Sequence, residues 1–201
     1  VIDMTNMFRK NDNFNVDISS WDVSRVQQMR FMFSEATSFN QDISGWNVSD
    51  VRTMREMFSD ASSFNQNLSN WDVSKVEDMT SIFEGAVSFN GDVSNWSLIG
   101  ITSAHAERLF WGASSFEGIG IETWDVSTLV SMRHMFREAS NFNRDISSWD
   151  VSKVFHFNNM FDGATSFNQD ISNWDISTAY GNDAMNNMFD NTDLSEDNQC
   201  T

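Results

Sequence analysis

The sequence predicts an α/β repeat solenoid, a stack of about eight coils of about 25 residues that each hold one short strand and one short helix. Three observations support this fold class. One unit recurs along the whole chain, all 12 methionines fall in two columns of that unit, and the spacing of apolar residues changes within it. A unit this short cannot bury its own apolar face, so the units are expected to stack.

The repeat reads W-D-V-S-x-V-x-x-M-x-x-M-F-x-x-A-x-x-F-N-x-D-I-S-x. Its tryptophans are 25 residues apart, except for one step of 28, and we expect them to lie in the core with the methionines and phenylalanines. The tryptophan column is Trp21, Trp46, Trp71, Trp96, Trp124, Trp149 and Trp174. The phenylalanine after the second methionine recurs as Phe8, Phe33, Phe58, Phe83, Phe110, Phe136, Phe161 and Phe189.

The segment V-x-x-M-x-x-M-F is the predicted helix. Its apolar residues are spaced at i, i+3, i+6 and i+7, which places them on one helical face. The preceding serine is suited to the N-cap position, and Ser24-Arg25-Val26-Gln27 and Ser74-Lys75-Val76-Glu77 match the capping box.

The segment I-S-x-W-D-V is the predicted strand. Tryptophan and valine alternate with a polar residue, as in a strand with one buried face. Stacking of the units would then build a sheet of short parallel strands. We assign residues 1–190 to this single array, with an irregular coil over 97–123, and residues 191–201 to a C-terminal cap or the start of a following segment.

The whole unit resembles a known repeat. The motifs that carry the resemblance are WDVSKVEDM at Trp71–Met79 and ATSFNQDISNWDIS at Ala164–Ser177. They are similar to the BspA-like leucine-rich-type repeats, in the 25–26-residue form found in bacterial and mycoplasma surface proteins and in marine algal and protist proteins. The resemblance implies a right-handed leucine-rich-repeat-like solenoid, a cell-surface or extracellular location with a role in adhesion, and no enzymatic activity.

Charge and composition exclude several function classes. The net charge of −17 argues against nucleic acid and anionic membrane surfaces as partners. No apolar run is long enough for a membrane span, so we expect no direct insertion by this segment. The chain opens mid-pattern at Val1, and we expect it to be a piece of a longer precursor. The single cysteine, Cys200, permits no internal disulfide.

Two columns of aspartate stand out on the predicted strand side, where no lysine or arginine interrupts them. One interpretation is that each carboxylate caps a turn by accepting hydrogen bonds from nearby backbone N–H groups. A second is that divalent cations, with Ca²⁺ the candidate, bridge successive carboxylates, and a third is contact with a mineral or a basic protein. The two columns are Asp22, Asp72, Asp125, Asp150 and Asp175, and Asp17, Asp42, Asp92, Asp145 and Asp170.

The irregular unit is the second candidate site. It contains Trp111, the tryptophan outside the column, together with Ile119 and Ile121. Insertions in repeat arrays emerge as loops on one face, so these residues are candidates for partner contact. The alternative is drift of a decaying repeat, with Trp111 covering a local gap.

Asparagine occurs in two further patterns. The column Asn15, Asn40, Asn65, Asn90, Asn143 and Asn168 is expected to bond backbone groups of the next coil. The sequons at Asn47, Asn67 and Asn95 are glycosylation sites if the source is a secretory eukaryotic protein.

No catalytic motif is present: the histidines share no column, and Cys200 has no histidine context for a nucleophile. The first hypothesis is therefore a non-enzymatic binding or structural protein that mediates adhesion, protein contact or assembly, including self-assembly. The second is a Ca²⁺- or mineral-binding protein that uses the aspartate columns, and a glycan-binding module is a third.

Overall fold

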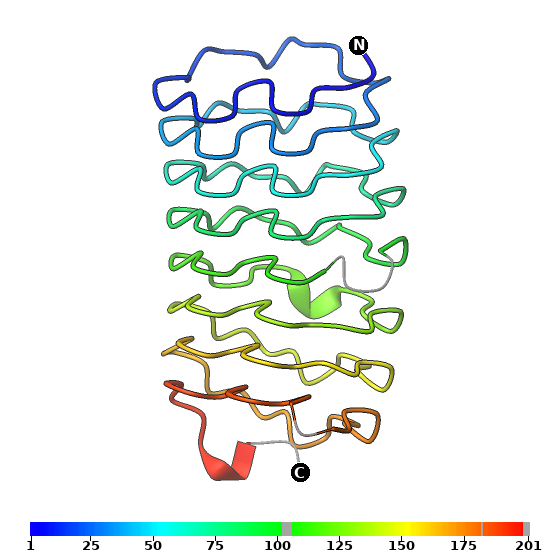
Figure 1. The fold of residues 1–201 in the computed structure, drawn as a ribbon, viewed down its shortest axis with the longest axis vertical. Helices are drawn as coiled ribbons and strands as arrows, with labels where there is room; N and C mark the ends of the chain where they lie inside the picture. The colour runs from blue at the N-terminus through cyan, green and yellow to red at the C-terminus, as the bar shows by residue number, and fades with distance from the viewer. Residues whose placement is uncertain (102–105, 182, 199–201) are drawn as a thin grey trace.

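The computed structural model describes residues 1–101, 106–181 and 183–198. The chain winds in successive coils that stack along one axis, in the order of the sequence (Figure 1). Each coil corresponds to one repeat, because residues about 25 positions apart lie one above the other, as the paired backbone hydrogen bonds show.

The predicted α/β fold class is wrong. The regular elements among the described residues are two short 3-10 helices, η1 (Ile121–Thr123) and η2 (Glu196–Asn198), with no α-helix and no sheet. Parallel pairing is limited to isolated bridges: Asp3–Gln28, Gln28–Thr53, Thr53–Asp78 and Ser131–His156. These bridges lie within the predicted helix, just before its first methionine position, rather than in the predicted strand.

A run of β-turns replaces the predicted helix. In the second coil, the N–H of Met32 donates to the carbonyl of Met29 at 3.3 Å, and the N–H of Ala36 to that of Phe33 at 3.0 Å. Phe31 and Glu35 adopt left-handed φ angles of 56° and 60°, which end any right-handed helix. We call this run the turn ladder; it comprises residues 4–11, 29–36, 54–61, 79–86, 106–113, 132–139, 157–164 and 185–192.

The remaining amides of the turn ladder bond to the next coil. The N–H groups of Phe31, Phe33 and Glu35 donate to carbonyls 24 residues later, at 2.9, 2.9 and 2.7 Å. A helix would use these same amides within its own segment. The capping-box prediction fails for a related reason: the N–H of Gln27 donates to the carbonyl of Ile2 in the first coil, at 2.8 Å.

The predicted strand is also a pair of turns. The N–H of Trp46 donates to the carbonyl of Ile43 at 3.1 Å, and that of Val51 to Val48 at 2.9 Å. Each turn directs one apolar side chain inward, so buried residues recur about every three positions. A helical face has nearly the same spacing, which explains why the sequence pattern indicated a helix.

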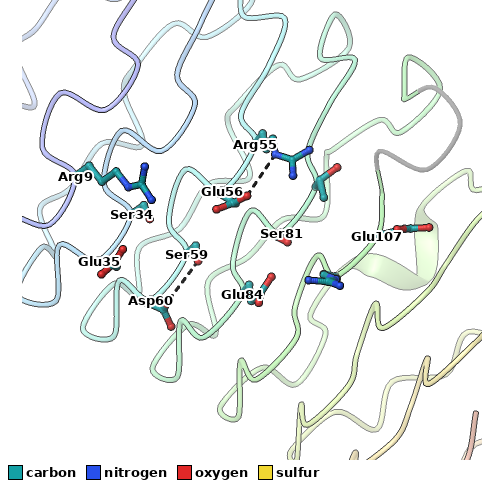
Figure 2. Close-up of a pocket in the computed structure, with 12 residues that line it drawn as sticks. Arg9, Ser34, Glu35, Arg55, Glu56, Ser59, Asp60, Ser81, Glu84 and Glu107 are labelled. Carbon is teal, nitrogen blue, oxygen red and sulfur yellow. Dashed lines mark hydrogen bonds and ion pairs between the residues drawn. The ribbon is translucent and has the colours of Figure 1, made fainter. Parts of the chain in front are cut away.

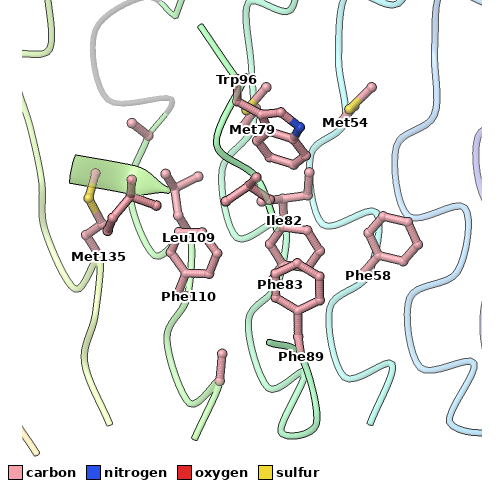
Figure 3. Close-up of a cluster of buried hydrophobic side chains, with 14 of the residues drawn as sticks. Met54, Phe58, Met79, Ile82, Phe83, Phe89, Trp96, Leu109, Phe110 and Met135 are labelled. Atoms are coloured by element: carbon pink, nitrogen blue, oxygen red, sulfur yellow. The ribbon is translucent and has the colours of Figure 1, made fainter. Parts of the chain in front are cut away.

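The predicted core columns are confirmed in the interior coils. Successive phenylalanines stack, with ring centroids 5.6 Å apart for Phe33 and Phe58 and 5.5 Å apart for Phe58 and Phe83. Phe58, Phe83 and Phe110 lie in neighbouring coils in Figure 3. The indole N–H of Trp71 donates to the carbonyl of Ile43 in the preceding coil at 3.0 Å. The first coil has no preceding coil among the described residues, and Trp21 is 38% exposed there.

The irregular coil keeps the tryptophan stack in register. Trp96 and Trp124 have centroids 6.4 Å apart although 28 residues separate them. One extra residue falls between Phe116 and Ile121, in the turn that leads into η1, where Gly120 has a left-handed φ of 87°. Residues 102–105, where other extra residues fall, lie outside the described part of the chain.

Candidate functional site

The aspartate columns form Asx-turns. In each case Oδ1 accepts a hydrogen bond from the backbone N–H two residues later, and several also accept one from a serine hydroxyl. Asp150 is typical, with 3.1 Å to the N–H and 2.6 Å to the hydroxyl of Ser152. Such bonds are present at Asp17, Asp22, Asp42, Asp72, Asp92, Asp125, Asp145, Asp150, Asp170 and Asp175. The turn-capping interpretation is therefore confirmed.

These hydrogen bonds favour the ionised carboxylates. The Ser152 hydroxyl, followed by the Ser152 backbone N–H, holds the pKa of Asp150 below its ordinary value. For Asp175 the bonds to Ser177 also lower the pKa, although the neighbouring Asp150 opposes them. Local hydrogen bonding thus outweighs the repulsion between stacked carboxylates.

The cation-bridging interpretation gains no support from this geometry. Among residues 1–101, 106–181 and 183–198, no group of three or more His, Cys, Asp or Glu side chains is arranged to hold a metal ion. Asn47 and Asn67 fill two positions of the columns and make the same turn, to Ser49 at 3.2 Å and Ser69 at 2.8 Å. The turn therefore requires a side-chain oxygen but not a charge.

The asparagine column bonds from coil to coil as predicted. The Oδ1 of Asn15 accepts from the N–H of Asn40 at 2.9 Å, and the Oδ1 of Asn40 accepts from that of Asn65 at the same distance. At the irregular coil, Glu117 takes the place of the asparagine and donates its N–H to Asn90 at 3.0 Å. These side chains hold neighbouring coils together and are not free to bind a ligand.

The three sequon asparagines are exposed. Asn47 and Asn67 serve the turns described above through Oδ1. Asn95 instead donates Nδ2 to the carbonyl of Ser69 at 3.1 Å, so its glycan-accepting nitrogen is engaged with the preceding coil.

The turn ladder is nearly neutral in a strongly acidic protein. It contains 7 of the 12 lysines and arginines and 8 of the 29 acidic residues. Its net charge is therefore −1, which leaves −16 of the total −17 on the rest of the chain. Seven basic residues thus face the same side of the stack: Arg9, Lys10, Arg30, Arg55, Arg108, Arg133 and Arg137.

A groove of about 600 Å³ crosses the turn ladder over the first five coils (Figure 2). Three arginines and five acidic residues line it, and buried serine residues lie between them. Arg55 and Glu56 pair at 3.3 Å, and Arg9 lies over the ring of Phe31 at 4.8 Å. The lining residues are Arg9, Ser34, Glu35, Arg55, Glu56, Ser59, Asp60, Thr80, Ser81, Glu84, Glu107 and Arg108.

The structure separates the three residues predicted for partner contact in the irregular coil. Trp111 is half-buried on the turn ladder, and Ile119 is 40% exposed in the turn before η1. Ile121 is fully buried in the core, so its predicted surface contact is wrong. Its position follows from the alignment of Ile121 with Ile146 and Ile171, which are core residues of later coils.

Sequence reasoning missed the residues around Trp111. The guanidinium groups of Arg108 and Arg137 each lie 5.0 Å from its ring centroid, and the ring of His134 stacks at 5.2 Å. Burial, then Arg108 and Arg137, lower the pKa of His134. A signal was present: in register with the repeat, Arg108 aligns with His134 and Trp111 aligns with Arg137.

These features define a tandem-repeat protein of stacked turn-built coils that has one acidic side and one side of mixed charge. The chain belongs to the family described as "Mycoplasma protein of unknown function, DUF285", which matches residues 1–96 and again residues 92–200. This agrees with the predicted membership of a repeat family. No curated protein matches the chain at a significant level. In the described part of the chain, no helix has the length and apolar character needed to cross a membrane.

Proposed function

We propose that this protein is a non-enzymatic protein-binding scaffold and that the turn ladder is its contact surface. The observation that carries the proposal is the groove across five successive coils, lined by arginines and acidic residues. Arginine and aromatic residues are enriched at protein interfaces, and the turn ladder combines both in Arg9 with Phe31 and in Arg108 with Trp111.

The other polar columns support the same assignment by exclusion. The aspartate and asparagine columns are occupied by hydrogen bonds that form turns and join coils. The ring of Trp111 packs against two guanidinium groups and an imidazole, which leaves little of its face for stacking on a sugar. The turn ladder is therefore the remaining surface, and it presents charged and aromatic side chains beside a groove.

We further propose a cell-surface or secreted location and a role in adhesion or assembly. The support for this is the resemblance of the repeat to the BspA-like surface proteins. The net charge of −17 supports a protein partner over nucleic acid, since the acidic side repels phosphate groups.

The test is affinity capture from an extract of the source cells with two charge-matched variants. Arg9→Glu with Arg55→Glu alters the groove, whereas Lys75→Glu with Lys153→Glu makes the same change of charge outside the turn ladder. We expect the native chain and the control to retain the same protein and the groove variant to lose it. Equal retention by both variants would place the contact elsewhere and refute the proposal.

A further inference from the structure

Four side chains form a compact array on the turn ladder where the irregular coil meets the next one. Arg108 and Trp111 come from one coil, and His134 and Arg137 occupy the equivalent positions one coil later. We call these four residues the basic–aromatic cluster. Both arginines lie 5.0 Å from the centroid of the Trp111 ring, and the imidazole of His134 stacks on it at 5.2 Å.

The coils on either side lack this combination. The equivalent positions are Ser81 and Glu84 in the preceding coil and Asn159 and Asp162 in the following one. In the first two coils, Arg9 occupies the position of Arg137 and Phe31 that of Arg108, so an arginine–aromatic pair recurs on the turn ladder, whereas Trp111 departs from the repeat.

One guanidinium group of the cluster has no carboxylate in ion-pair contact within the described part of the chain, although Glu84 and Glu107 line the same groove. Arg137 has two acidic neighbours, Glu138 at 3.2 Å and Asp162 at 3.3 Å. Arg108 is exposed, and no carboxylate of the described residues lies within 4.0 Å of it. Arg133 beside the cluster contacts no carboxylate of the described residues and bonds Asn158 at 3.0 Å and the ring of His156 at 3.3 Å.

Polar atoms within the cluster also lack hydrogen-bond partners. Nδ1 of His134 is buried and has none among the described residues. Nε of Arg137 is likewise without a hydrogen bond, although Glu138 and Asp162 lie within ion-pair distance. Both carboxylates are out of line with the N–H group, and a misaligned carboxylate does not satisfy an N–H donor.

We propose that the basic–aromatic cluster binds carboxylate side chains of an acidic segment in a partner protein. This inference rests on the proposed function and names the partner class for the same surface. A guanidinium group recognises a carboxylate through two parallel hydrogen bonds. Stacking on Trp111 holds each guanidinium plane in place, which lowers the entropy lost on binding.

Electrostatics orients such a partner. The aspartate columns on the other side of the coils repel an acidic segment, and the basic–aromatic cluster attracts it. Binding is therefore expected at one place along the stack and in one orientation, and it should weaken as salt concentration rises.

The test is a titration of the full chain against a fluorescein-labelled peptide of alternating glutamate and serine, followed by fluorescence anisotropy. A peptide with glutamine in place of glutamate controls for charge. The test variant combines Arg108→Gln with Arg137→Gln, and the matched control combines Arg25→Gln with Arg52→Gln, two exposed arginines outside the turn ladder. A second variant pair, Arg108→Lys with Arg137→Lys, keeps the charge but not the planar group.

We expect the native chain to bind the glutamate peptide and not the glutamine peptide. The double glutamine variant should bind at least about tenfold more weakly, the lysine variant should fall between, and the control should match the native chain. Thermal melts establish that each variant is folded, and if the double variant is not, Arg108→Gln alone decides because Arg108 is exposed.

Three results would overturn the inference. They are no binding of the glutamate peptide by the native chain, a control variant that binds as weakly as the double glutamine variant, and complete displacement of the peptide by inorganic phosphate at the same concentration as the peptide. The last would show a site for simple anions. If peptide binding fails but capture still depends on Arg9 and Arg55, the contact surface stands and only the partner class falls. If both fail, the proposed function falls as well.

Discussion

Glycine at a left-handed position of the turn ladder should stabilise this protein. Glu35 has a φ of 60°. For an L-amino acid the left-handed conformation costs roughly 1–2 kcal/mol, whereas glycine adopts it freely. Gly85, Gly112 and Gly163 already occupy the equivalent position in other coils. The change Glu35→Gly therefore removes strain that these three coils avoid.

The expected magnitude follows from three contributions. Relief of strain raises the free energy of unfolding by roughly 1–2 kcal/mol, and the added flexibility of the unfolded chain lowers it by roughly 0.5–1 kcal/mol. The ion pair of Glu35 with Lys10, at 3.4 Å and exposed, contributes at most about 0.5 kcal/mol. The free energy of unfolding should therefore rise by about 0.5 kcal/mol.

Glu77→Gly is the matched control. Glu77 is also exposed and pairs with Arg52 at 3.4 Å, but its φ is not positive. Glycine there brings only the cost, about 1 kcal/mol. The two variants should differ by about 1.5 kcal/mol, which corresponds to roughly 3–6 °C in Tm for a chain of this size.

The assay is thermal unfolding followed by tryptophan fluorescence, with the native chain and both variants in the same buffer. The account predicts a midpoint at or above the native value for Glu35→Gly and below it for Glu77→Gly. If glycine at position 35 lowers the midpoint as much as glycine at position 77, the left-handed turn is refuted and a helical segment is favoured.

Three further predictions concern the core, the irregular coil and the aspartate columns. Trp71→Phe removes the hydrogen bond to Ile43 and leaves a cavity, so it should lower the free energy of unfolding by about 2–3 kcal/mol, measured by chemical denaturation. Trp21→Phe in the more open first coil should lower it by less than half as much. Equal losses would contradict the role of the indole N–H. Gly120→Ala would place a methyl group 2.5 Å from the Cα of Ser94 and should lower Tm clearly, whereas Gly45→Ala, with no atom within 4 Å, should leave Tm near the native value. Lowering the pH from about 5 to about 3 should lower Tm. The folded state has a lowered pKa at Asp22, Asp72, Asp125, Asp150 and Asp175. The stability that these carboxylates contribute is therefore present above the ordinary pKa of 3.8 and is lost as the pH falls through the lowered pKa of the folded state. Changing these five to asparagine should keep the turns, as Asn47 and Asn67 do, and flatten that dependence; an unchanged slope would assign the acid sensitivity to other groups.

The sequence predicted the repeat, its register and its core, because burial depends on spacing alone. Phe33, Phe58 and Phe83 had to stack once their units stacked, whatever the backbone between them. The sequence did not distinguish a helix from successive turns. Both bury a residue about every three positions. They differ in the hydrogen-bond acceptor of each amide: the N–H of Phe31 donates to the carbonyl of a residue 24 positions later in the sequence, in the next coil.

The candidate site was only partly predictable for a similar reason. Trp111 stood out because it departs from the repeat, but its neighbours His134 and Arg137 come from the next coil and look unremarkable in their own unit. Ile121 was misassigned because the insertion obscured its alignment with the core isoleucines. Aligning the repeat units position by position would have shown that Ile121 falls in the core isoleucine column and that charged residues of adjacent units lie next to Trp111.

The most direct test of the turn-built stack is an NMR measurement of scalar couplings across backbone hydrogen bonds. The structure places the N–H of Phe58 against the carbonyl of Ile82 in the next coil, at 2.9 Å. The account predicts a coupling between the amide nitrogen of Phe58 and the carbonyl carbon of Ile82. A coupling to the carbonyl carbon of Met54, four residues earlier, would show an α-helix and contradict the account.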